Sequence, residues 1–227
     1  MKTMPFFIHS TSTAELLGGL LATKGTAAHG YCAGAIARTP DGFVRNSTDF
    51  ADAVHHLSLL HGQAPGLISH AATRIAENAA RRWLVKAVDG FARERAYLNR
   101  IVVAAGPAPS TAGQDRTSTL VSQQRHAIEM LAQSDRRGCA LGAAIALILD
   151  WSAIRALLDG GSARLGIDPP LLVIPNRHDT LNILAGLDDD PRICRAVHFG
   201  ANQLLTQHGG IWDLLQARSQ ARKATRF

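Results

Sequence analysis

The stretch CALGAAIALIL, from Cys139 to Leu149, decides the fold. Its 11 residues are apolar on every face of a helix, so every side of that helix favours burial. A bilayer span needs about 20 such residues, and the run is therefore too short to cross a membrane. The stretch predicts a helix that other helices cover on all sides, in a protein that has no membrane partner.

Composition indicates that the covering elements are helices as well. Hydrophobic residues make up 46% of the 227-residue chain, but aromatic residues only 5%. Alanine and leucine are abundant and runs of β-branched residues are scarce, which favours helices packed through small side chains. We therefore expect an all-α protein that folds as a single domain around one core.

Capping residues and glycines divide the chain into helices. The pattern predicts a helical bundle with four core helices in residues 48–160. Within it, residues 65–106 are expected to form one long helix that Gly90 can kink. Residues 1–47 are expected to form a helix followed by a glycine-rich loop, and residues 161–227 to form further helices and a basic tail.

The C-terminal part is expected to contain two successive helices, one that ends near His208 and one that begins at Gly210. Before them, Leu171–Ile174 follows a double proline and is expected to be extended, either as a plain crossing segment or as one short strand.

The basic charge is concentrated at the C-terminus. The chain carries 24 Lys and Arg against 18 Asp and Glu, a formal net charge of +6. The tail from Arg218 onward holds Arg218, Arg222, Lys223 and Arg226 without an acid, which leaves about +2 for the rest. A short basic helix end is expected to be solvated, and we do not expect a nucleic-acid partner.

Cysteine usage and the N-terminus both favour the cytoplasm. Cys32, Cys139 and Cys194 are far apart and form no CxxC pair, which fits reduced thiols that pack as small apolar residues. The apolar patch near the N-terminus is shorter than the hydrophobic region of a signal peptide.

Histidines in the first core helix are candidates for a buried site. The apolar stripe of this helix runs through Phe50, Val54 and Leu57 to His61, and His56 lies at its margin. Positions five apart differ by about 140° around a helix, so His56 and His61 cannot bind one metal ion from the same helix. Hydrogen bonds from His61 to the free carbonyls of the helix end are the alternative to a ligand role.

Two carboxylates are expected to face the core. Glu94 and Asp150 each fall in an apolar row of their helix, and Arg82 lies at the margin of such a row. A buried carboxylate needs an ion-pair partner, hydrogen bonds, a proton or a metal ion. For Asp150 the open partners are Arg82, Arg155 or a histidine.

A histidine and a glutamate three residues apart form the third candidate. His126 and Glu129 share one face of a helix, which is similar in one respect to the Glu-x-x-His pairs of ferritin-like di-iron bundles. The order here is reversed and the pair lies opposite the apolar stripe of its helix. A surface pair is therefore the alternative.

Two functional hypotheses follow. The first is a helical bundle without catalytic machinery, as a monomer or a homodimer, that binds a protein partner or a small ligand. Its ligand-binding candidates are His56, His61, Arg82, Glu94 and Asp150. The second is a metal- or cofactor-dependent bundle enzyme of ferritin-like or haem-oxygenase-like architecture. Its candidate ligands for a divalent metal are His61, Glu94, Asp150, His126 and Glu129. The second hypothesis requires carboxylate oxygens and a histidine nitrogen to converge within about 5 Å of one another.

The segment LHGQAPGLISHAA, together with the Ala- and Arg-rich helices, resembles an all-helical family of alphaproteobacteria that has no established activity. The resemblance covers mainly residues 50–100. It implies a bacterial cytoplasmic protein and carries no expectation about chemistry.

Overall fold

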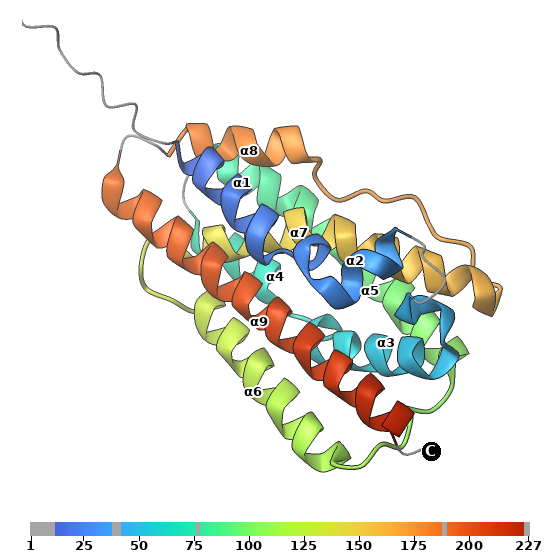
Figure 1. The fold of residues 1–227 in the computed structure, drawn as a ribbon. Helices are drawn as coiled ribbons and strands as arrows, with labels where there is room; N and C mark the ends of the chain where they lie inside the picture. Colours follow the sequence, from blue (N-terminus) through green and yellow to red (C-terminus); the bar gives the residue numbers. More distant parts are fainter. Residues whose placement is uncertain (1–11, 38–41, 76–77, 188–189, 225–227) are drawn as a thin grey trace, which may run out of the picture.

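The structure, a computed structural model, describes residues 12–37, 42–75, 78–187 and 190–224. Within these residues the chain forms helices and no strand, which confirms the all-α class (Figure 1). The α-helices are α1 (Thr13–Lys24), α2 (Gly30–Ile36), α3 (Ser47–His61), α4 (Leu67–Arg74), α5 (Asn78–Ala105), α6 (Gln114–Ala132), α7 (Cys139–Ser162), α8 (Arg177–Ala185) and α9 (Pro191–Ala224). Short 3-10 turns at Thr26–Ala28, Phe43–Arg45 and Ala163–Leu165 connect some of them.

Helix α7 is the centre of the bundle, as its apolar sequence predicts. Among the described residues, Cys139–Leu165 is long and apolar enough to cross a membrane, with a mean hydropathy of 1.7 in its most apolar window. Other helices nevertheless bury 78% of that window, and Ile145 and Trp151 are wholly buried. Burial in the core of the protein is therefore a sufficient explanation for the length and the apolar sequence of this helix.

The most extensive helix contact joins α7 to α9, which crosses in front of it in Figure 1. Gly142 lies against the backbone of Val197, and Gly200 lies against the carbonyl of Cys139, so a methyl group at either glycine would collide with the other helix. Gly138 contacts Ile193, four residues before Val197. Residue numbers therefore increase in the same direction along both helices, so α7 and α9 are parallel and their N-termini lie at the same end.

The core extends beyond residues 48–160. Helix α9 continues through Gly209 and Gly210, where the sequence suggested a break, and it buries Leu204, Leu205 and Trp212 completely. Burial of one face along its whole length compensates the low helix propensity of the two glycines.

Two expectations about the first half of the chain are also corrected. The segment 65–106 is not one helix, because Ile75 is extended and separates α4 from α5. Gly90 lies inside α5, where a Cβ atom would come within 2.9 Å of the Ile174 backbone. Because Gly90 has no side chain, the segment Leu171–Ile174 can pass close to α5. This segment is extended and forms no strand within the described residues.

The described part of the predicted glycine-rich loop packs against the bundle. It contains α2, and both Cys32 and Phe43 are buried. The rings of Tyr31 and Phe43 stack with centroids 4.6 Å apart. This segment also carries Thr26 to the centre of the molecule.

Candidate functional site

Asp150 is the centre of a buried polar cluster between α7, α9 and the turn after α1. Its Oδ1 atom accepts a hydrogen bond from the backbone N–H of Thr26 at 2.7 Å. Its Oδ2 atom accepts from the Thr26 hydroxyl at 2.7 Å and from Nδ1 of His208 at 2.6 Å. Of the partners left open by the sequence, the structure therefore supplies a histidine, which comes from α9.

His61 extends this cluster at the C-terminal end of α3. Its Nε2 atom lies 3.0 Å from Nε2 of His208, so a proton on one of the two nitrogens joins the rings. The His61 ring also meets the edge of Trp151, with centroids 5.8 Å apart. Burial, and then the charges of His208 and Arg95, hold the pKa of His61 well below its ordinary value. His61 is therefore neutral at pH 7 and bonds another side chain, where a helix-end carbonyl was the expected alternative to a ligand role.

Glu94 lies in the core, as its spacing predicts, but in a separate set of contacts. Its Oε1 atom accepts from Nη1 of Arg155 at 2.7 Å, and its Oε2 atom accepts from the indole N–H of Trp151 at 2.9 Å. Arg155 also donates to Asp159 at 2.6 Å. Burial alone would lower the pKa of Arg155, but the bonds and charges of Asp159 and Glu94 outweigh it and raise that pKa. Glu94 and Asp150 thus bind different partners.

The other predicted ligands do not join this cluster. His126 is exposed, and its Nδ1 atom lies 3.7 Å from Oε2 of Glu129 in a surface pair. Arg82 is exposed on α5. Within the described residues no group of three or more His, Cys, Asp and Glu side chains could hold a metal ion. The convergence that the metal hypothesis requires is therefore not found among Glu94, Asp150 and the histidines.

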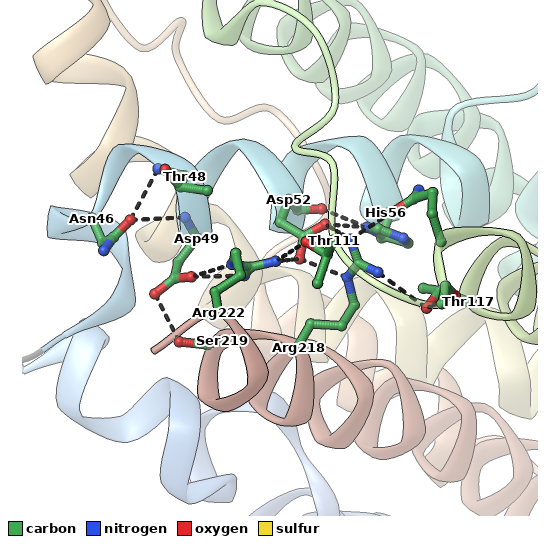
Figure 2. Close-up of polar contacts among 12 residues, drawn as sticks. Asn46, Thr48, Asp49, Asp52, His56, Thr111, Thr117, Arg218, Ser219 and Arg222 are labelled. Atoms are coloured by element: carbon green, nitrogen blue, oxygen red, sulfur yellow. Dashed lines mark hydrogen bonds and ion pairs between the residues drawn. The ribbon is translucent and has the colours of Figure 1, made fainter. Parts of the chain in front are cut away.

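A second buried polar cluster fixes the end of α9 against α3 (Figure 2). We call Asp49, Asp52, Arg218 and Arg222 the C-terminal clasp. Arg218 donates to both oxygens of Asp52, at 2.8 and 2.9 Å, and Arg222 donates to Asp52 at 2.6 Å and to Asp49 at 2.7 Å. Arg218 is only 4% exposed. The expectation that this basic tail is solvated is wrong for Arg218 and Arg222, because two acids of α3 bind them.

The ion pairs determine the protonation of the clasp. Burial alone would raise the pKa of Asp52. Hydrogen bonds from His56, Arg218 and Arg222 outweigh it and hold that pKa well below its ordinary range. Asp52 is therefore ionised at every pH at which the protein is expected to be folded.

His56 belongs to the clasp side of α3 and not to the cluster around Asp150. Its Nδ1 atom lies 2.7 Å from the backbone oxygen of Asp52, to which it donates. Its Nε2 atom is buried and has no hydrogen-bond partner within the described part of the chain. The structure thus separates His56 from His61, as the angle between them requires.

Sequence reasoning missed the residues that complete both clusters. Thr26 comes from a segment expected to be a loop, and His208 was placed only as the end of a helix. Asp49 and Asp52 are three residues apart and share one face of α3. Two acids on one face of a helix are compatible with a solvated face or with a buried basic partner, so this spacing is the signal that the sequence offers.

Two neighbouring hollows lie at the common N-terminal end of α7 and α9. The first arginine hollow has a volume of about 410 Å³, and the charged residues that line it are Arg74, Asp135, Arg136 and Arg137. The second arginine hollow has a volume of about 460 Å³, and the charged residues that line it are Arg136, Arg137, Asp190, Arg192 and Arg195. Ile193 forms part of both walls.

The second arginine hollow contains guanidinium groups that no carboxylate of the described residues neutralises. Within the described residues, the side chains of Arg136, Arg192 and Arg195 form no ion pair. Arg136 lies over the ring of Phe199, 5.1 Å from its centroid. The parallel helices α7 and α9 add the positive ends of their dipoles at this end of the bundle.

Comparison with known proteins gives a match at the level of a family. The model of a family of unknown function matches residues 21–223. No curated protein and no solved structure matches the chain. The matched range contains both buried clusters and both hollows.

Proposed function

We propose that this chain, which belongs to the DUF6975 family of unknown function, binds a small anionic ligand in the second arginine hollow. The observation that carries the proposal is a set of three guanidinium groups in the wall of one hollow, on Arg136, Arg192 and Arg195, that form no ion pair within the described residues. Asp190 is the only acid among the described residues of that wall.

Arginine fits this role because its planar guanidinium binds phosphate and carboxylate groups through two parallel hydrogen bonds. The volume of about 460 Å³ lies within the range of about 300–1,000 Å³ that is usual for small-ligand sites. The positive ends of the α7 and α9 dipoles favour an anion at the same end of the bundle, and at α9 Asp190 already accepts the N–H of Arg192, so there the side chains and not the backbone would bind the ligand. A phosphorylated or carboxylated metabolite is therefore the ligand class that we propose.

The buried clusters support a binding function over catalysis. The carboxylates of Asp150, Glu94 and Asp52 already accept hydrogen bonds from protein donors, and all three are shielded from water. Their contacts hold α3, α7 and α9 together, so these residues form the scaffold of the hollow. In this proposal the protein acts in the cytoplasm, where small phosphorylated molecules are abundant.

The test is calorimetric titration of the full chain with inorganic pyrophosphate at low ionic strength. We expect saturable binding, and a dissociation constant at least about tenfold higher for the Arg192→Ala/Arg195→Ala variant, since charged hydrogen bonds contribute about 1.5–3 kcal/mol each. The matched control is Arg81→Ala/Arg82→Ala, which removes the same charge from exposed positions on α5 and should bind like the parent protein.

Two results would overturn the proposal. The first is no binding of pyrophosphate by the parent protein. The second is an equal loss of affinity in both variants, which would show that net charge alone attracts the anion.

A further inference from the structure

An exposed aromatic side chain lies beside the second arginine hollow. Within the described residues, Phe199 is the only aromatic residue that is exposed, at 40%. The guanidinium of Arg136, which lines the hollow, lies over this ring, 5.1 Å from its centroid. The ring and the guanidinium therefore form an aromatic and cationic surface at the edge of the hollow. Surfaces of this kind stack against planar aromatic groups of a ligand.

Phe199 shares one face of α9 with two arginines of the hollow. Arg192, Arg195 and Phe199 occupy positions i, i+3 and i+7, which lie on the same side of a helix. Ala196 of the wall lies between the arginines and the ring. The four residues from Arg195 to Phe199 span about 6 Å of the helix axis. A small molecule that lies along this face can therefore contact the arginines at one end and the ring at the other.

The hollow also contains an acceptor for a hydroxyl group. Asp190 is the only acid among the described residues of its wall, and its Oδ1 atom accepts the backbone N–H of Arg192 at 2.8 Å. A carboxylate repels a bare phosphate, but it accepts a hydrogen bond from a sugar hydroxyl. A ligand that carries hydroxyl groups next to its phosphate therefore matches this wall better than an inorganic anion does.

We infer that the ligand is a nucleotide, with its phosphate bound by the arginines of α9 and its base stacked on the surface of Phe199 and Arg136. The ribose then lies over Ala196, and one of its hydroxyl groups donates to Asp190. This inference rests on the proposed function and adds a ligand class to it, that of nucleoside phosphates. The volume of about 460 Å³ and the single exposed ring favour one nucleotide over a longer nucleic acid.

The base should add affinity that the phosphate alone does not supply. Stacking of one base on an aromatic side chain commonly changes an affinity by about tenfold or more. AMP and ribose 5-phosphate share the phosphorylated sugar and differ in the adenine. The ratio of their dissociation constants therefore measures the contribution of the base, and the contribution of the arginines cancels.

The experiment is calorimetric titration of the full chain with AMP and with ribose 5-phosphate at low ionic strength. Phe199→Leu removes the ring but keeps an apolar side chain, and Phe199→Tyr is the matched control that keeps the ring. Arg195→Ala removes a phosphate contact and leaves the ring in place. Both positions are exposed, and thermal melts establish that each variant folds.

We expect AMP to bind about tenfold or more tightly than ribose 5-phosphate in the parent protein and in Phe199→Tyr. In Phe199→Leu this ratio should fall to about three or less. Arg195→Ala should weaken both ligands and leave their ratio unchanged. Equal affinity for the two ligands in the parent protein, or a ratio that survives Phe199→Leu, would overturn the nucleotide.

This result is distinguishable from failure of the proposed function. If only the nucleotide is wrong, pyrophosphate still binds and Arg192→Ala/Arg195→Ala still weakens it. If pyrophosphate, ribose 5-phosphate and AMP all fail to bind, both inferences fall. Tighter binding of an oligoadenylate than of AMP would also reject the single nucleotide, in favour of a nucleic acid.

Discussion

Replacement of Asp52 by asparagine tests whether the C-terminal clasp is a structural ion-pair network. The carboxylate accepts two hydrogen bonds from Arg218, at 2.8 and 2.9 Å, and one from Arg222 at 2.6 Å. Asparagine preserves the shape of the side chain but removes the charge, and its amide nitrogen presents a donor where an acceptor is needed. Arg218 is 4% exposed and cannot turn its guanidinium into water without disturbing the end of α9.

The expected loss follows from the charge that remains. Removal of one partner of a buried ion pair costs about 3–5 kcal/mol, because the other charge stays buried without compensation. Arg222 retains its bond to Asp49 at 2.7 Å, so the cost arises mainly at Arg218. We therefore expect Asp52→Asn to lower the free energy of unfolding by about 3 kcal/mol, measured by urea denaturation and far-UV circular dichroism.

A double variant separates the stranded charge from a simple loss of packing. Asp52→Leu/Arg218→Met replaces both partners by apolar side chains, which is often close to neutral for a buried pair. We expect it to recover at least half of the loss seen in Asp52→Asn. A loss below about 1 kcal/mol in the single variant, or a double variant that is less stable than the single one, would refute the reasoning.

Three further predictions concern the buried histidines and Asp150. Because the pKa of His61 is lowered in the folded protein, His61 takes up a proton in the unfolded chain at a higher pH than in the folded protein. The free energy of unfolding should therefore fall as the pH drops from about 7 toward 5, by up to about 1.4 kcal/mol per pH unit for this group. Urea titrations at each pH should show a smaller slope for His61→Gln, and an unchanged slope would contradict the assignment. Asp150→Leu should cost about 3 kcal/mol or more in the same assay at pH 7, because donors of Thr26 and His208, both 1% exposed, lose their acceptor; a cost below about 1 kcal/mol would mean that they find other partners. His56→Leu should lower the free energy of unfolding by about 1–3 kcal/mol, since it removes the Nδ1 donor that the buried backbone oxygen of Asp52 accepts, and an unchanged stability would show that the buried Nε2 atom, which has no partner within the described residues, costs as much as this bond contributes.

The sequence was sufficient to locate two of the buried carboxylates, Glu94 and Asp150, but not to identify what binds them. Glu94 and Asp150 each interrupt an apolar row of a helix, and the period of a helix alone determines which face such a row occupies. Their partners depend on which helices pack together. Arg155 lies five residues from Asp150 in the same helix, yet it binds Glu94 of α5, while Asp150 binds His208 of α9.

Charge counting failed at the C-terminus for a related reason. Arg218 and Arg222 are four residues apart and share one face of α9, and Asp49 and Asp52 share one face of α3. Considered alone, each pair is compatible with a helix face that is exposed to solvent. Only the contact between α3 and α9 shows that the two pairs neutralise each other, and that contact joins residues about 170 positions apart.

The arginine hollows were invisible in the sequence because their members come from three segments. Arg136 and Arg137 follow α6, Arg192 and Arg195 lie in the first turns of α9, and Arg74 ends α4. Their proximity depends on the parallel packing of α7 and α9, which brings two helix N-termini to one end of the bundle. No local pattern encodes that packing, although the glycines at the crossing make it sterically feasible.

Ion pairing distinguishes the polar residues that hold this fold together from those that we propose to bind a ligand. From the sequence, inward-facing residues such as Asp150 and Glu94 are the candidates for a site, since a buried charge is costly unless it is paired or bound to a ligand. In the structure both carboxylates are satisfied by protein donors, so a ligand would have to displace bonds that already hold the helices together. Arg192 and Arg195 are exposed and, within the described residues, form no ion pair, so an anion can bind them without breaking an ion pair of the fold.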